Sequence, residues 1–115
     1  MAKIPFSKLG LKTNTNIGVI SWDEYDIEVN RYLPFKAKTE LVSNIINYSV
    51  DENGFYNPLK VKLYMVLEIV YSYTNLTFTA KMKEDPFKLY DAIVSSGLFD
   101  QIVREIDPSD WAAIQ

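Results

Sequence analysis

Residues 58–74, PLKVKLYMVLEIVYSYT, decide the fold, because this segment is apolar on nearly every side. A helix without a wide polar face is buried by neighbours on several sides, so we predict that 58–74 is the central helix of the core. The segment starts at Asn57-Pro58, where the asparagine oxygen can accept the free amides of the first turn. Proline at the first helical position costs the helix no hydrogen bond, because the N–H that it lacks would have no partner there.

The same kind of start recurs downstream at Asp85-Pro86 and Asp107-Pro108. It predicts one helix over 86–96, ended by Gly97, and another from 108 onward. Residues 98–106 carry apolar side chains at helical spacing, and so do residues 35–49, which follow Pro34. We expect 35–49 to bury Phe35, Leu41, Val42, Ile45 and Ile46 and to expose Lys36, Lys38, Glu40 and Asn44. In 86–96 we expect burial of Phe87, Leu89, Tyr90, Ile93 and Val94.

Residues 17–33 predict a β-hairpin. Residues 17–22 are rich in strand-forming side chains, and Asp23-Glu24 supplies a polar turn. From Tyr25 to Asn30 the sequence alternates, which places Tyr25, Ile27 and Val29 on one face and Asp26, Glu28 and Asn30 on the other. A lone hairpin is marginal in water, so its apolar face must lie on the helices or on another subunit.

These segments together predict an α+β fold that is mainly helical. Residues 1–16 form an N-terminal arm, and residues 17–115 form a single domain. In that domain the hairpin (17–33) packs on a bundle of four to five short helices (34–115).

The 115 residues contain no histidine and no cysteine. The chain therefore lacks disulfides, a thiolate nucleophile, the commonest metal ligand and the usual general base. Asp51-Glu52-Asn53-Gly54 is not a calcium loop, because the position of the terminal acid is Lys62. No glycine-rich phosphate loop or separated carboxylate pair replaces these groups. We predict a non-enzymatic protein with no catalytic residues, no cofactor and no metal.

The charges are unevenly placed. The net charge is −3, which argues against nucleic acid as a partner. Residues 1–20 carry three lysines and no acid, whereas residues 23–28 carry four acids. Solubility is the simplest interpretation of this pattern. Residues 61–73 are interrupted by polar side chains and are too short to span a bilayer, and no signal peptide is visible, so we expect no membrane association.

Aromatic residues are abundant, with eight tyrosines, six phenylalanines and two tryptophans. Most of them are expected to fill the core, and a role in base stacking is disfavoured by the few basic residues near them. Tyrosine also suits protein interfaces, because its body is apolar and its tip is polar. Our candidate partner-binding residues are Trp22, Asp23, Glu24, Tyr25, Asp26 and Glu28 on the hairpin, and Tyr48, Phe55 and Tyr56 around the turn before the central helix.

Four stretches carry a family resemblance: YDIEVNRYLPFKAK (25–38), YTNLTFT (73–79), DPFKLYD (85–91) and SSGL (95–98). They resemble small morphogenesis proteins of tailed bacteriophages that infect low-GC bacteria, closest to tail assembly chaperones or minor virion components. The resemblance covers about residues 20–106. It implies a fold and a protein-binding role, with no catalytic residues to carry over, and the family members continue beyond the length of this chain.

We therefore expect a non-catalytic phage-encoded protein that binds other phage proteins in virion or tail assembly, with self-association as a further candidate. Its expected location is the host cytoplasm during infection, or the virion. The alternative is a small acidic inhibitor of a host defence complex, such as an anti-CRISPR protein, or a trigger sensed by such a complex. In the inhibitor, the acids of residues 23–28 would imitate nucleic-acid phosphates.

Overall fold

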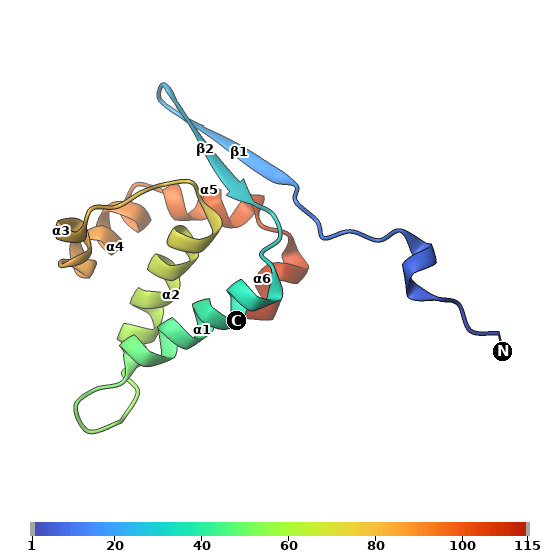
Figure 1. The fold of residues 1–115 in the computed structure, drawn as a ribbon. Coiled ribbons are helices and arrows are strands. Elements are labelled where there is room, and N and C mark those ends of the chain that lie inside the picture. The colour runs from blue at the N-terminus through green and yellow to red at the C-terminus, as the bar shows by residue number, and fades with distance from the viewer. Residues whose placement is uncertain (1, 115) are drawn as a thin grey trace.

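A computed structural model describes residues 2–114 and confirms a mainly helical α+β fold (Figure 1). The short 3-10 helix η1 (Phe6–Leu9) precedes strands β1 (Ile17–Trp22) and β2 (Tyr25–Asn30). The helices are α1 (Phe35–Ser49), α2 (Pro58–Tyr73), α3 (Ala80–Lys83), α4 (Pro86–Ser95), α5 (Leu98–Glu105) and α6 (Pro108–Ile114). The sequence did not predict α3, which has only four residues and starts where the Thr79 hydroxyl accepts the Met82 N–H at 3.2 Å.

The three predicted helix starts at Pro58, Pro86 and Pro108 are confirmed, and at the first two the preceding side chain forms the predicted cap. Asn57 Oδ1 accepts the N–H of Leu59 at 3.0 Å and that of Lys60 at 3.4 Å. Asp85 Oδ1 accepts the N–H of Lys88 at 3.2 Å. These bonds satisfy amides that have no partner within the first helical turn.

Helix α2 is the centre of the core, as its apolar surface predicted. It packs along α1 and also contacts α4 and α5. Ile69 and Val70 have no exposed surface, and Leu67 is almost completely buried. The neighbours on several sides explain why the segment has no wide polar face.

The hairpin packs on the helices of its own chain. Strands β1 and β2 are antiparallel, with Ile20 opposite Ile27, and both residues are buried with Val29. The outer edge of β2 is joined to the segment after α2, because the Glu28 N–H donates to Asn75 Oδ1 at 3.0 Å and the Asn75 N–H donates to the Glu28 carbonyl at 3.2 Å.

Several burial predictions are wrong. Tyr25 is 65% exposed, because the tip of the hairpin extends past the helices (Figure 1). The buried face of α1 consists of Lys38, Leu41, Ile45 and Ser49. It is therefore rotated about the helix axis relative to the predicted buried face. The residues predicted to be buried that are instead exposed are Phe35, Val42 and Ile46 on α1, and Phe87 and Val94 on α4.

A buried polar cluster around Asp110 fixes α6 to the rest of the domain. Asp110 Oδ2 accepts the Tyr73 hydroxyl at 2.5 Å and the Leu33 N–H at 3.2 Å, and Oδ1 forms an ion pair with Lys38. The Lys38 ammonium also lies 4.2 Å from the centre of the Tyr32 ring. Burial and the bond to Asp110 raise the pKa of Tyr73 well above its usual value, so its hydroxyl stays a donor.

Candidate functional site

The structure separates the predicted partner-binding residues into two groups. The hairpin tip and the loop between α1 and α2 lie at opposite ends of the domain (Figure 1). They therefore do not form one site.

The hairpin tip presents its acids to solvent. Asp23, Glu24, Asp26 and Glu28 are all exposed, whereas Trp22 is half-buried against the core. Asp23 has a positive φ of 54°, which a two-residue hairpin turn requires and which aspartate tolerates better than most residues. Asp23 and Glu24 therefore lie at the exposed turn, whereas Glu28 lies farther along β2, where its backbone is bonded to Asn75.

The loop before α2 presents aromatic side chains. Asp51 Oδ1 accepts the N–H groups of Asn53 and Phe55, both at 2.9 Å, which holds the loop in shape. Phe55 is 70% exposed, and Tyr56 is also exposed. Tyr48, at the end of α1, is exposed as well, and its ring lies 5.2 Å from the Tyr64 ring.

The N-terminal arm is a third surface, which we did not include among the candidate residues. Residues 2–16 are all exposed, and Figure 1 shows them running away from the domain. The base of the arm is held by the Arg31 N–H, which donates to the Asn16 carbonyl at 3.1 Å. The radius of gyration is 16.9 Å, against about 13 Å for a compact chain of this length. The exposed apolar side chains of the arm are Ile4, Phe6, Leu9 and Leu11.

A groove lined by α1, α2, α3 and the start of α4 is a fourth feature, and it was not predicted from the sequence. The groove has a volume of about 430 Å³ and is lined by Asn44, Tyr48, Tyr64, Leu67, Glu68, Tyr71, Lys83 and Pro86. Glu68 is 8% exposed, and its Oε2 accepts the Asn44 side-chain amide at 3.3 Å. Burial raises the pKa of Glu68, and the bond from Asn44 and the charge of Lys83 oppose this rise.

A sequence signal for this groove was available. Tyr64, Glu68 and Tyr71 are spaced four and three residues apart, so they share one face of α2. Glu68 is also the one acid within the largely apolar residues 61–73. A single acid inside such a segment is a candidate for a perturbed, functional carboxylate.

The polar side chains that line the groove are Asn44, Glu68, Lys83 and three tyrosines. Among residues 2–114, no group of three or more acidic side chains is placed to hold a metal ion. Nor does this part of the chain contain a helix with the length and apolar character needed to cross a membrane.

Comparison with known proteins finds no matching family model, no matching curated protein and no matching solved structure. The functional argument therefore depends on the surfaces described above.

Proposed function

We propose that this chain is a non-catalytic protein that binds other proteins during the assembly of a tailed-phage particle, as an assembly chaperone or a minor virion component. The observation that carries the proposal is the apolar arm held away from the domain. Exposed apolar side chains such as Phe6 and Leu11 do not stabilise the monomer, whereas their burial against a partner protein would lower the free energy of the complex. The phage setting comes from the sequence stretches within residues 20–106.

The arm also defines the chemistry of its partner. Lys3, Lys8 and Lys12 alternate with the apolar residues, and no acid lies in the first twenty residues. A complementary surface is therefore apolar with an acidic rim. The aromatic loop at Phe55 and Tyr56 supplies a second contact surface at the far end of the domain. Such a protein works in the host cytoplasm during infection, and in the virion if it stays in the particle.

The test is affinity purification from infected cells, with the tag at the C-terminus so that the arm stays free. We expect virion or tail proteins to co-purify with the full chain and to be lost from a variant lacking residues 2–12. The domain of that variant should unfold at the same temperature as the full chain, because residues 2–12 bury nothing. Recovery of host nuclease subunits in place of virion proteins would contradict the assembly role.

A second candidate is inhibition of a host defence complex, and the exposed acids of the hairpin tip favour it. Asp23, Glu24, Asp26 and Glu28 are exposed along a hairpin whose tip extends past the helices, and they can enter a basic groove as phosphates do. Reversal of these four charges to lysine would abolish inhibition if the acids imitate nucleic acid. Partner binding that survives this reversal excludes the imitation. The matched control reverses four exposed acids elsewhere, namely Glu40, Glu52, Glu84 and Asp91.

A further inference from the structure

The groove described above is lined by three tyrosines and a single carboxylate. Helix α2 contributes Tyr64, Glu68 and Tyr71 from one face, and α1 contributes Asn44 and Tyr48, four residues apart, from the facing side. We call these five residues the tyrosine groove. Three electron-rich rings and one carboxylate thus line the same groove, and both kinds of group attract an organic cation.

The carboxylate of Glu68 lacks a full complement of partners. The Glu68 residue as a whole is 8% exposed, and its Oε2 accepts a hydrogen bond from the Asn44 side-chain amide at 3.3 Å. Within residues 2–114, neither ion pair closer than 4.0 Å involves Glu68, because these pairs are Arg31–Glu105 and Lys38–Asp110. A carboxylate that is partly removed from water, with one oxygen free of hydrogen bonds and close ion pairs within this part of the chain, gains from a cation brought into contact with it.

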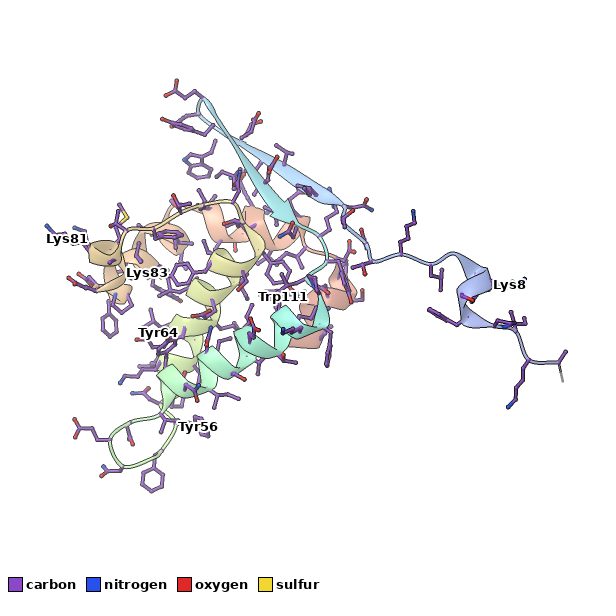
Figure 2. The ribbon with its side chains drawn as sticks, in the orientation of Figure 1. Lys8, Tyr56, Tyr64, Lys81, Lys83 and Trp111 are labelled. Atoms are coloured by element: carbon purple, nitrogen blue, oxygen red, sulfur yellow. The ribbon has the colours of Figure 1, made fainter. Side chains whose placement is uncertain are left out.

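The groove already faces one cation from its own chain. The Lys83 ammonium lies 4.7 Å from the centre of the Tyr71 ring, and its charge acts on Glu68 without forming a close ion pair. Lys83 is exposed and belongs to the four-residue helix α3, on the same side of the molecule as Tyr64 (Figure 2). A lysine held at the rim is in a position to compete with an external cation.

We propose that the tyrosine groove binds an organic ammonium group, with Glu68 as its counter-ion and the tyrosine rings against its charge. The ammonium belongs to a free amine or to a lysine side chain of another protein, which share this chemistry. The volume of about 430 Å³ accommodates the ammonium with its alkyl chain. An anion would be repelled by Glu68, and a single carboxylate does not provide the ligands of a metal ion.

The probe is n-butylammonium, added to the full chain and followed by two-dimensional NMR of the backbone amides. We expect saturable shifts at Asn44, Tyr64 and Tyr71. The neutral probe n-butanol, which has the same alkyl chain, should produce no saturable shift. Nα-acetyl-lysine N-methylamide, in which both backbone ends are blocked and the side-chain ammonium is free, separates the two sources. Affinity equal to that of n-butylammonium favours a lysine side chain as the ligand, and weaker affinity favours a free amine.

Three variants test the assigned roles. Glu68→Gln keeps the shape of the side chain and removes its charge, so the affinity for n-butylammonium should fall about tenfold or more. Lys83→Met removes the competing cation and should raise the affinity several-fold. Lys81→Met is the matched control, because Lys81 lies on the same helix but does not line the groove, and it should leave the affinity unchanged.

Three results would overturn the proposal: no saturable shift with n-butylammonium, equal binding of n-butanol, or unchanged affinity in Glu68→Gln. Weaker binding in Lys83→Met would also overturn it, because Lys83 would then support the ligand. Thermal unfolding of each variant checks that the domain remains folded. The result is independent of the assembly function, since the purified chain is tested without any protein partner.

Discussion

Replacement of Asp110 by asparagine tests whether the buried polar cluster holds the C-terminal helix in place. The Asp110 side chain is 1% exposed and that of Lys38 is 11% exposed, so Asp110→Asn leaves an ammonium buried without its counter-ion. The asparagine oxygen can still accept from Tyr73 and Leu33, which isolates the loss of charge. Loss of one partner of a buried pair costs about 3–5 kcal/mol. For 115 residues the total free energy of unfolding is about 6–17 kcal/mol.

The assay is urea unfolding followed by circular dichroism, with the free energy taken from the midpoint and slope. A double variant, Lys38→Met with Asp110→Asn, should be more stable than Asp110→Asn alone, because no unpaired charge remains buried. Lys36→Met, on the exposed side of the same helix, should change the free energy by less than about 0.5 kcal/mol. A loss below about 1 kcal/mol in Asp110→Asn, or a double variant less stable than the single one, would refute this reasoning.

Three further predictions concern the core, the hairpin turn and the groove. Ile69→Ala should lower the free energy of unfolding by about 2–5 kcal/mol, whereas Leu59→Ala, at a side chain that is 79% exposed, should change it by less than about 0.5 kcal/mol in the same urea assay. Asp23→Gly should raise the thermal midpoint, with a gain of about 0.5–1 kcal/mol. The relief of the positive φ, about 1–2 kcal/mol for an L residue, exceeds the entropy that glycine adds to the unfolded chain, about 0.4–1 kcal/mol. Glu68→Gln should stabilise the chain at pH 7, and the gain should disappear as the pH falls below 4.5, when measured by urea midpoints across this range. The sign follows from the raised pKa, since the folded chain binds this proton more tightly than the unfolded chain and loses stability as the pH rises above 4.5.

The parts of the fold that depend on neighbouring residues were predictable from the sequence. Asn57 and Asp85 act on amides two or three residues away, so the sequence contains the whole interaction. The hairpin was predictable for the same reason, because strand alternation and a polar turn are local patterns. The α+β class followed from these elements and from the apolar segment 58–74.

The parts that depend on distant residues were not predictable. Lys38 was assigned to a polar face, but its partner Asp110 lies 72 positions away and brings it into the core. Tyr25 follows the alternation of β2, yet it lies beyond the helices that would cover it. The spacing of Tyr64, Glu68 and Tyr71 was visible in the sequence. The burial of Glu68, however, depends on Asn44 of α1 and on the position of α3. Burial of a polar residue is decided by tertiary packing, which a local pattern does not contain.

The two buried acids have opposite effects on the fold. Asp110 has a counter-ion and two hydrogen-bond donors, so its charge is matched inside the domain. Glu68 has one amide donor and a distant ammonium, and burial raises its pKa, so its charge weakens the folded state at neutral pH. Carboxylates with a raised pKa that line a groove are enriched at binding and catalytic sites. This contrast places Asp110 in the structural framework and makes Glu68 the residue around which a ligand is to be sought.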